Sequence, residues 1–481
     1  MQETDPEEYG MRKTKIICTI GPASDSEEMM ERLIHAGMNV ARFNFSHGTH
    51  EEHLVKLNRL KKVRTKLNMP IAALLDTKGP EIRLRDFENG KVLLERGKTF
   101  TLTTEEILGD ENRASISYKG LPNDVAKGAV ILIDDGLIGL RVTGVTATDI
   151  TCVVENGGYI SNHKGINVPD VELSMPFISN QDREDIIFGC EQNFDFIACS
   201  FVRTAQDVYD VRRIIAENGG KMKIIAKIES TQGVRNLEEI LDVSDGVMIA
   251  RGDLGVEVPL EEVPVIQKHA IRIARKMGKT VVTATQMLDS MMRNPRPTRA
   301  EATDVANAIY DGTTAIMLSG ETAAGSYPES AVRTMSRIAE CAEKDIDWAG
   351  MLKKMDLTEK ANYTPAIAHA ACMIAEDIGA TAIITVSLSG FTARALSQFR
   401  PTCPVIACAP DMQIACQSNL MFGVQPLIIG REKELDRLLD TAVERSKYAG
   451  YVRTGDRVIV TAGMPLGVAG KTNTIRVVEV D

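Results

Sequence analysis

A lysine and a glutamate, Lys227 and Glu229, stand two residues apart at the end of the apolar run 224–228. In a β-strand, residues i and i+2 point to the same side, so the cation and the carboxylate project together. A carboxylate can bind a divalent metal while a neighbouring ammonium faces the oxygens of a transferring phosphoryl group. Taken alone, the pair is better explained as an ordinary ion pair at a strand end, so its surroundings must decide.

Polar and charged residues follow the ends of seven predicted strands in the same way. These segments are 42–47 (RFNFSH), 76–83 (DTKGPEIR), Ser200 with Arg203, Lys227 with Glu229, 250–253 (ARGD), 283–286 (TATQ) and 319–322 (SGET). In a closed parallel barrel the carboxyl ends of all strands meet at one face, where active sites form. A purely structural scaffold does not require polar residues at so many ends. The recurrence therefore favours a shared pocket over an isolated ion pair.

Two groups of oxygen ligands are expected in this pocket. Glu229 and Asp253 supply two hard carboxylate ligands, which suits Mg²⁺ that keeps water and substrate oxygens in its other positions. A second oxygen-rich group carries only one formal negative charge and suits a monovalent cation better than Mg²⁺. This group consists of Asn44, Ser46, Asp76 and Thr77.

The same pocket is expected to attract anions. Arg42, Lys227 and Arg83 supply positive charge for phosphate or carboxylate groups. Gly252 has no side chain, so an anion can approach the backbone closely at the start of the following helix. The sequence 250–253 is by itself equally consistent with a turn that caps that helix.

Three histidines, His47, His50 and His53, raise the alternative of a zinc site. Zinc requires ligands that converge on one point. The i, i+3, i+6 spacing at a helix start places His47 and His53 well off a common face. We therefore interpret the three histidines as solvated residues at the start of a helix.

Eight short apolar strands must position this pocket. They are predicted at residues 16–20, 39–43, 71–76, 196–200, 223–228, 246–250, 280–284 and 315–318. Amphipathic helical patterns lie between most of them, at residues 26–36, 50–67, 207–218, 264–277 and 301–310. Such alternation, with nearly continuous apolar strands, predicts an α/β fold with a (β/α)₈ TIM barrel. We assign residues 1–78 and 177–345 to this catalytic barrel, with residues 1–10 as a mobile acidic arm.

Two segments of different character interrupt and follow the barrel. Residues 79–176 are rich in Gly, Thr and Val, in short alternating runs separated by turn signals. This pattern predicts an inserted small all-β lid domain, in the form of a β-barrel beside the active-site face. After a charged link, residues 346–481 alternate between strands and helices again. They predict a C-terminal α/β domain.

Composition excludes several classes of protein. The 481 residues are 44% hydrophobic and 25% charged with a net charge of −10, which is ordinary for a globular protein of two to four domains and argues against nucleic-acid binding. No apolar run reaches the ~18 residues that span a membrane, so no membrane partner is expected. The N-terminus is acidic, unlike a signal peptide. The nine cysteines include no Cys-x-x-Cys pair, which is typical of reduced core residues in a cytoplasmic protein.

Six long motifs, in order along the chain, resemble those of the pyruvate kinase family. They are residues 39–48 (NVARFNFSHG), 75–83 (LDTKGPEIR), 226–229 (AKIE), 250–257 (ARGDLGVE), 284–288 (ATQML) and 294–301 (NPRPTRAE). The similarity extends from about Met11 to Asp481, so Met11 is an alternative native start to Met1. The resemblance is to the bacterial type without the extra C-terminal phosphotransfer-like domain. It implies a phosphotransferase of glycolysis that makes pyruvate and ATP from phosphoenolpyruvate and ADP.

The resemblance also implies roles for individual residues by motif match. Arg42 holds the substrate phosphate, Lys227 stabilises the transferring phosphoryl group, and Thr285 orders the proton source for the enolate. Gly252, Asp253 and Thr285 also contact the substrate. The family's ion and nucleotide ligands match further positions: Glu229 and Asp253 for Mg²⁺ or Mn²⁺, Asn44, Ser46, Asp76 and Thr77 for K⁺, and Arg83, Lys164 and His47 for the nucleotide.

Family resemblance further predicts how the protein is regulated. A glutamate at position 81 accompanies K⁺ dependence in the family, so we expect K⁺ activation. Two loops of the C-terminal domain resemble an allosteric site for a phosphorylated effector: Ser387, Ser389, Gly390 and Thr392 in one, Gly467 and Gly470 in the other. Leu388 replaces a lysine common in members activated by fructose bisphosphate, which leaves a sugar monophosphate or AMP as equal alternatives. A homotetramer is expected.

Two rival functions were weighed against this one. A Mg²⁺-dependent aldolase or mutase acting on phosphoenolpyruvate or pyruvate also uses a barrel, but such enzymes lack a nucleotide-binding lid. A catalytically idle sensor would bind effectors through the C-terminal domain alone. The presence of Arg42, Lys227, Glu229 and Asp253 together argues against that sensor.

Overall fold

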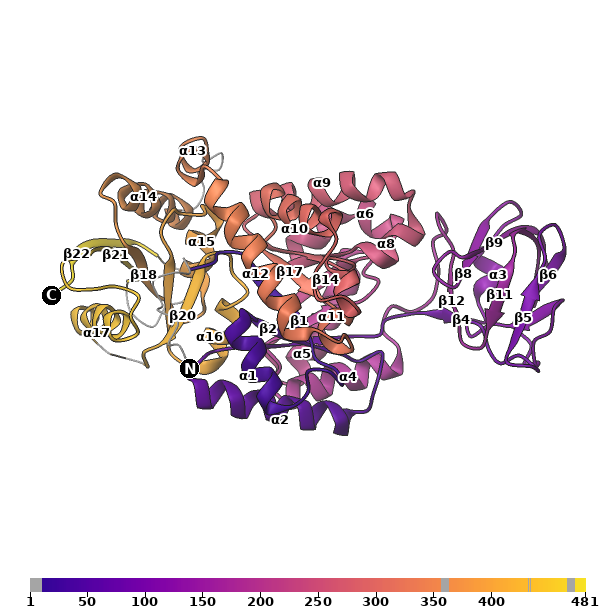
Figure 1. The fold of residues 1–481 in the computed structure, drawn as a ribbon. Helices are drawn as coiled ribbons and strands as arrows, with labels where there is room; N and C mark the ends of the chain where they lie inside the picture. The colour runs from indigo at the N-terminus through magenta and orange to yellow at the C-terminus, as the bar shows by residue number, and fades with distance from the viewer. Residues whose placement is uncertain (1–10, 356–362, 431, 433, 465–471) are drawn as a thin grey trace.

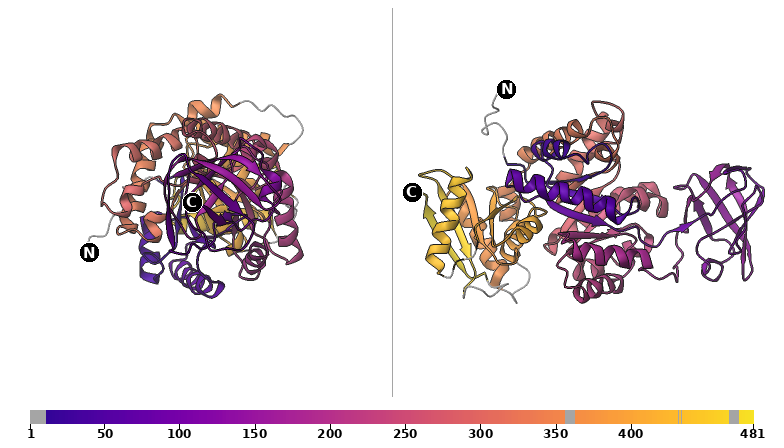
Figure 2. Two further views of the ribbon diagram at one scale, coloured as in Figure 1. Left: turned by 90° about the vertical axis from the view of Figure 1, so that its right-hand side faces the viewer. Right: turned by 90° about the horizontal axis from the view of Figure 1, so that it is seen from below.

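The computed structural model describes residues 11–355, 363–430, 432, 434–464 and 472–481 of the chain. Figure 1 shows three bodies in a row, with the barrel between a β-rich insert and the C-terminal α/β domain, and Figure 2 shows the same row from two further sides. None of the helices in this described part combines the length and the apolar character that a transmembrane span requires.

Eight parallel strands close into the predicted barrel, in the order β1-β17-β16-β15-β14-β13-β3-β2. Their bounds are β1 Lys15–Thr19, β2 Val40–Asn44, β3 Ala72–Asp76, β13 Phe196–Cys199, β14 Lys223–Ile228, β15 Gly246–Ala250, β16 Thr280–Ala284 and β17 Ala315–Leu318. The first and last of these strands along the chain pair with each other, with Lys15 in register with Ala315. The eight strand predictions are confirmed to within about one residue at each end.

Alternate residues of each barrel strand serve two different cores. Ile16 and Cys18 point outward and pack against the surrounding helices. Ile17 points inward and packs with Leu74, Met248 and other residues that fill the barrel interior. This alternation follows from the two-residue period of a strand, and it makes the barrel a filled scaffold rather than a channel. Only the ends of the strands are therefore available for a site.

Helices surround the barrel. Their bounds are α1 Glu27–Ala36, α2 His50–Leu67, α4 Asn180–Glu191, α5 Ala205–Glu217, α6 Thr231–Arg235, α7 Leu237–Val243, α8 Arg251–Glu257, α9 Val263–Lys276, α10 Arg299–Asp311, α11 Gly320–Ala323 and α12 Pro328–Asp345. The predictions for α5 and α10 began two residues late. Asp207 and Glu301 are not first helical residues, because each closes a capping box with the threonine three positions earlier.

The insert is an all-β body with its own core. A seven-stranded sheet has the order β4-β12-β8-β9-β10-β6-β7, and a two-stranded sheet pairs β11 with β5. A bridge between Leu84 and Ile116 links the two edges of the larger sheet. The bounds are β4 Ile82–Arg83, β5 Lys91–Leu94, β6 Thr99–Thr103, β7 Arg113–Ser115, β8 Val130–Ile133, β9 Ile138–Val145, β10 Asp149–Asn156, β11 Gly158–Ser161, β12 Gly165–Asn167 and helix α3 Leu121–Asp124. Strands β4 and β12, of two and three residues, are too short to show a clear alternation in the sequence.

The C-terminal domain contains a five-stranded sheet of order β20-β19-β18-β21-β22, in which only β22 runs antiparallel to its neighbour. The bounds are α13 Trp348–Lys353, α14 Tyr363–Asp377, β18 Ala382–Val386, α15 Phe391–Gln398, β19 Val405–Ala409, α16 Met412–Ser418, β20 Val424–Ile428, α17 Leu435–Tyr448, β21 Arg457–Ala462 and β22 Thr474–Glu479. The predicted charged link includes helix α13. Its Trp348 is buried and lies below the ammonium of Lys13, 5.2 Å from the ring centre.

Candidate active site at the mouth of the barrel

Lys227 lies near the carboxyl end of β14 and is almost completely buried, with 8% of its surface exposed. Its Nζ donates a hydrogen bond to Ser200 Oγ at 2.7 Å and to Asp76 Oδ1 at 3.2 Å. Nζ also lies 2.9 Å from Glu229 Oε1. The structure thus brings together residues from the ends of β3, β13 and β14, as the recurrence of polar strand ends predicts.

Burial would favour a neutral lysine, but two carboxylates prevent this. Burial alone lowers the pKa of Lys227, and the negative charges of Asp76 and Glu229 outweigh it, so its pKa lies above the ordinary value. Burial likewise acts to raise the pKa of Asp76, but Arg42 and Lys227 hold that pKa below its usual range. The ammonium of Lys227 is therefore a permanent positive charge at neutral pH.

Arg42 shares Asp76 with Lys227. The guanidinium of Arg42 donates from Nε to Asp76 Oδ2 at 2.6 Å and from Nη1 to Thr19 Oγ1 at 2.9 Å. One carboxylate, on β3, therefore holds two cations in fixed positions on β2 and β14, two strands that are not adjacent in the barrel. The sequence interpretation placed Asp76 only in the monovalent-cation group and did not foresee this bridging contact.

The four residues of the predicted monovalent-cation group lie at the ends of β2 and β3. Asn44 and Asp76 are register partners in these strands. Asn44 Oδ1 accepts from the backbone N–H of Ser46 at 3.2 Å, and Thr77 Oγ1 accepts from the N–H of Ser200 at 3.2 Å. These contacts bring the four oxygen-bearing residues into one neighbourhood. The assignment of K⁺ to them stays a prediction.

Glu229 offers a carboxylate with one oxygen whose nearest charged partner is the ammonium of Lys227. Its Oε2 accepts from the N–H of Phe201 at 2.6 Å. Its Oε1 is within ion-pair distance of Lys227, yet the angles satisfy no hydrogen bond, and Oε1 has no hydrogen-bond partner among the described residues. Burial raises the pKa of Glu229 to about 7 despite the opposing attraction of Lys227, and the charge of Asp253 adds to the rise.

These features fit a divalent metal held by few protein ligands. A buried carboxylate oxygen without a hydrogen-bond partner, close to a second carboxylate, is the donor set that a hard cation requires. In the part of the chain that the structure describes, no cluster of three or more His, Cys, Asp or Glu side chains is arranged to hold a metal. Glu229 and Asp253 would therefore leave several positions of an octahedral ion to water and substrate oxygens, which suits Mg²⁺ or Mn²⁺.

Thr285 and Gly252, predicted to contact substrate, are in direct contact with each other. The backbone N–H of Gly252 donates to Thr285 Oγ1 at 2.8 Å. Thr285 adopts a left-handed backbone with φ of 69°, which is strained for a β-branched residue. Arg251 stabilises this turn by donating to the carbonyls of Ala284 and Thr285, at 3.2 and 2.7 Å, while it pairs with Asp304 at 2.7 Å.

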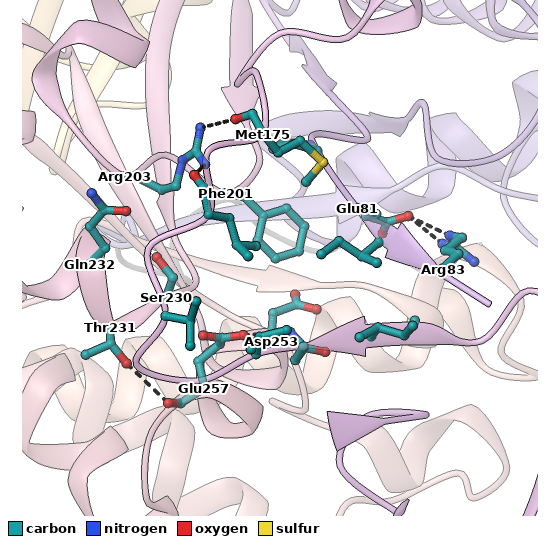
Figure 3. Close-up of a pocket in the computed structure, with 18 of the residues that line it drawn as sticks. Glu81, Arg83, Met175, Phe201, Arg203, Ser230, Thr231, Gln232, Asp253 and Glu257 are labelled. Carbon is teal, nitrogen blue, oxygen red and sulfur yellow. Dashed lines mark hydrogen bonds and ion pairs between the residues drawn. The ribbon is translucent and has the colours of Figure 1, made fainter. Parts of the chain in front are cut away.

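A cleft of about 330 Å³ lies between the mouth of the barrel and the insert. Figure 3 shows Asp253 and Glu257 on one side of it and Glu81 with Arg83 on another. Arg83 pairs with Glu81 at 2.6 Å, and Lys164 pairs with Asp134 at 2.8 Å. Two of the predicted nucleotide ligands, Arg83 and Lys164, therefore line the same cleft.

Histidines near α2 differ from the sequence interpretation. His47 is exposed in the loop after β2 and does not line this cleft. His53 is buried rather than solvated, because its ring stacks on Phe45 with 4.0 Å between ring centres. His50 is half-buried and pairs with Asp185 at 2.6 Å. The prediction of solvated residues was thus wrong for His53, whose helix face meets the aromatic core.

Comparison with known proteins agrees with this geometry. The family model for the pyruvate kinase barrel domain matches residues 11–332, and the model for the pyruvate kinase alpha/beta domain matches residues 365–478. The chain belongs to the pyruvate kinase family. It is 50% identical to the pyruvate kinase of Clostridium acetobutylicum over 473 residues, which covers 98% of this chain and 100% of that protein.

Two further relatives support the same assignment. A pyruvate kinase of Staphylococcus aureus is 49% identical over 469 residues, covering 97% of this chain and 80% of that protein. A crystal structure of a pyruvate kinase from Cryptosporidium parvum superimposes with a TM-score of 0.94 at 38% identity, covering 99% of this chain and 98% of that one. The chain is thus a phosphotransferase of the pyruvate kinase type.

Ser200 and Arg251 belong to the polar segments at the predicted strand ends, but the sequence alone predicts no role for them. Ser200 joins Lys227 to β3, because its Oγ accepts from Lys227 and donates to the carbonyl of Thr77 at 2.7 Å. The signal was present, since Ser200 directly follows a barrel strand. Phe201, whose N–H binds Glu229, could not be found from residue type, because a backbone donor has no sequence signature.

The predicted effector loop of the C-terminal domain lies at the start of α15. Gly390 has a left-handed φ of 74° immediately before the helix. Thr392 Oγ1 lies 2.7 Å from Thr472 Oγ1, and Leu388 is exposed. Ser387 and Ser389 lie in the same loop, whereas Gly467 and Gly470 lie outside the described residues. The effector site stays a prediction.

Proposed function

We propose that this chain transfers the phosphoryl group of phosphoenolpyruvate to ADP, and so produces pyruvate and ATP in glycolysis. One observation carries the proposal. Lys227 is buried and kept charged by Asp76 and Glu229 at the barrel mouth, beside Arg42 and next to the cleft that Arg83 and Lys164 line. The names of the relatives support the same reaction.

Positive charge is what this reaction needs most. Both substrates are anionic, and phosphoryl transfer spreads further negative charge over the equatorial oxygens. In the proposed mechanism Arg42 binds the phosphate of phosphoenolpyruvate from one side. Lys227 faces the phosphoryl oxygens as they move, and Arg83 and Lys164 bind the phosphates of ADP. When bound to Glu229 and Asp253, Mg²⁺ or Mn²⁺ supplies further positive charge against the substrate oxygens.

Transfer leaves an enolate, which must take a proton on carbon. Thr285 is placed to order the water or hydroxyl that delivers this proton. Its Oγ1 donates to the carbonyl of Ala284 at 2.6 Å and accepts from Gly252, so the hydroxyl has a fixed orientation. This role is one of positioning, and it leaves the identity of the proton donor open.

Water must be kept from the phosphoryl group during transfer. The insert stands beside the cleft, and its movement toward the barrel would exclude water. Asn167 of β12 already contacts the barrel side, where its Nδ2 donates to Glu257 Oε1 at 2.9 Å. We propose that the insert acts as the lid of this site.

Three finer properties belong to the same proposal. K⁺ binds at Asn44, Ser46, Asp76 and Thr77 and activates the enzyme. A phosphorylated effector binds at the C-terminal loops near Ser387, Ser389, Gly390 and Thr392. The protein forms a homotetramer and works in the cytoplasm. Light scattering after size exclusion tests the tetramer, and activation by fructose bisphosphate, a sugar monophosphate or AMP tests the effector.

A lactate-dehydrogenase-coupled assay with phosphoenolpyruvate, ADP, Mg²⁺ and K⁺ tests the central reaction. We expect pyruvate formation that requires ADP and the divalent metal. Pyruvate formation without ADP would indicate a lyase or phosphatase and contradict the proposal. A folded protein with no turnover would instead support the sensor alternative.

A further inference from the structure

A second polar pocket lies at the opposite end of the barrel, where the barrel meets the C-terminal domain. It has a volume of about 30 Å³. Residues before and at the start of β16, together with Thr314 before β17, form one wall, and α15 with the segment after α16 forms the other. Figure 1 shows α15 and α16 between the barrel and the C-terminal sheet. This pocket is separate from both the barrel mouth and the predicted effector loops.

Four cations and no carboxylate line this pocket. The cations are Arg275, Lys279, Arg394 and Arg400. The remaining lining residues are uncharged. Cations gathered in a partly buried place without a counterion destabilise a fold, because neither solvent nor a carboxylate compensates their charge.

Arg400 is the most deeply buried of the four, with 5% of its surface exposed. Its Nη2 donates to the carbonyl of Gly312, and its guanidinium lies over the ring of Phe422 at 3.9 Å. Its Nη1 is buried and has no hydrogen-bond partner among the described residues. The carboxylate that acts on it, Glu343, already accepts from the backbone N–H groups of Lys13 and Thr14 at 2.7 and 2.6 Å.

The other cations are also short of acidic partners. The Nε of Arg275 is buried without a hydrogen-bond partner in the described part of the chain. Lys279 donates to the backbone carbonyls of Asp242 and Ser244, at 3.1 and 2.7 Å, rather than to a carboxylate. Arg394 faces the ring of Phe391 at 5.4 Å. Two of the four cations therefore offer buried N–H donors, and all four offer charge.

We propose that this pocket binds a small inorganic oxyanion of the phosphate or sulfate class. A guanidinium matches the oxygens of such an ion in geometry as well as in charge. The pocket volume of 30 Å³ corresponds to roughly two or three water-sized groups, which argues against a ligand as large as a sugar or a nucleoside. The anion satisfies the buried donors of Arg275 and Arg400 at once.

Binding there would connect two bodies of the molecule. Arg275 and Lys279 belong to the barrel, at the end of α9 and the approach to β16. Arg394 lies in α15 of the C-terminal domain, and Arg400 follows that helix. An anion held from both sides stabilises the junction, so it raises the stability of the whole chain and the affinity falls when either side loses its cation.

Thermal unfolding of the full chain tests this site. Sodium sulfate is titrated into the protein at constant ionic strength, with sodium gluconate as the balancing salt, and the Tm is followed. We expect a rise in Tm that follows the logarithm of the sulfate concentration and reaches about 1.5 °C at ten times the Kd. The double variant R275Q/R394Q changes two partly exposed arginines and keeps Arg400, so the fold is preserved. Its rise should be smaller than that of the wild-type chain, because only the general stabilising effect of sulfate remains.

Two control variants locate the binding. R445Q removes an exposed arginine of α17, and R42Q removes the arginine expected to bind phosphate at the barrel mouth. Both should keep the full rise. An equal rise in R275Q/R394Q, or no rise in the wild-type chain, overturns the proposal.

Crystals soaked in sodium selenate give a direct measurement, because selenium scatters anomalously. The expected result is an anomalous peak between the side chains of Arg275 and Arg400, absent from crystals of R275Q/R394Q. Peaks confined to the barrel mouth or to the loops after β18 would assign the anion to those sites and refute a site at the junction.

Discussion

A buried lysine lies at each end of the barrel, and the two lysines differ in their partners and in the direction of their pKa shifts. Lys227 at the mouth is 8% exposed and Lys15 at the other end is fully buried. Lys227 has two carboxylates within 3.2 Å of its Nζ. Lys15 Nζ donates to one backbone carbonyl, that of Val424, at 2.5 Å. The pKa of Lys227 lies above its ordinary value, whereas burial, reinforced by Arg12, lowers the pKa of Lys15 to about 7.

The difference suggests separate roles for the two lysines. The charge of Lys227 serves the chemistry of the site, whereas Lys15 serves the packing of the fold. At the mouth, each cation has a carboxylate partner, and the pairs are arranged around Asp76 so that positive charge is fixed before substrate arrives. At the junction with the C-terminal domain, Lys15 and Arg400 have backbone carbonyls and an aromatic ring as partners. Barrel enzymes place activity at the first end and stability at the second. The contrast leads to tests that act on one end only.

The largest effect is expected from K227M. This change removes a charge whose interaction is made mainly in the transition state, so kcat should fall about 10³-fold or more while the KM for phosphoenolpyruvate stays within about tenfold. K15M removes a lysine at the other end that is also buried, and should keep kcat within about twofold. The coupled assay measures both, and circular dichroism checks folding. A comparable loss of kcat in the two variants would contradict the prediction that only the lysine at the mouth contributes to catalysis.

The second test concerns stability against pH. The unfolded chain holds a proton on Lys15 up to about pH 10.5, but the folded chain releases it near pH 7. Between these values the unfolded state binds more protons, so stability rises with pH and is lost as pH falls toward 7.

From pH 7 to pH 9 this linkage amounts to about 2 kcal/mol in the free energy of unfolding. Urea denaturation of the wild-type chain should show the rise, and K15M should lack it. A wild-type profile parallel to that of K15M would show that Lys15 stays protonated in the folded state.

The third test acts again at the mouth. Glu81 is paired with Arg83 and lines the cleft. In buffer free of K⁺, Na⁺ and NH₄⁺, wild-type activity should fall about tenfold or more, because a fixed cation is missing from the oxygen-rich group. E81K supplies an ammonium in place of the ion. The ratio of activity with K⁺ to activity without K⁺ should therefore fall to near 1. Full wild-type activity in that buffer would contradict the K⁺ site.

The smallest effect is expected at the connection between barrel and insert. Arg203 follows β13 and donates to the carbonyls of Leu173 and Met175, at 3.0 Å each. R203A removes these charge-assisted hydrogen bonds from the returning segment of the insert. The KM for ADP should rise about threefold, with kcat little changed, and limited proteolysis should cut near residue 173 sooner. An unchanged cleavage rate would show that Arg203 does not hold this segment.

Much of the fold could be predicted from the sequence, because the barrel repeats one strong signal. Every barrel strand is a short apolar run, and polar residues follow seven of the eight, so both the strands and the polar ends were recognisable. The small strands of the insert were not, since Ile82–Arg83 and Gly165–Asn167 contain too few residues to show a period. Their pairing is decided by contacts with other strands.

The residues that form the site could be predicted from the sequence, but the pairs in which they contact one another could not. Lys227 and Glu229 were expected to face different partners, and the structure places their charged atoms 2.9 Å apart. Asp76 was expected to face a monovalent cation, and it bridges Arg42 and Lys227. Residue type indicates which groups bear charge. Which groups pair depends on register between strands that are distant in the sequence.

The pairing of Lys15 with Ala315 has a consequence for the order of events on the ribosome. The first barrel strand leaves the ribosome early, but its partner β17 is synthesised roughly 15 to 60 s later at ordinary rates of elongation. The ring cannot close during that interval. The insert pairs strands that are near neighbours in sequence, such as β9 with β10, so it can fold during the wait. The nascent chain would then carry a folded insert beside an unclosed barrel whose apolar strands are exposed. At this stage a chaperone would have the largest apolar surface to cover.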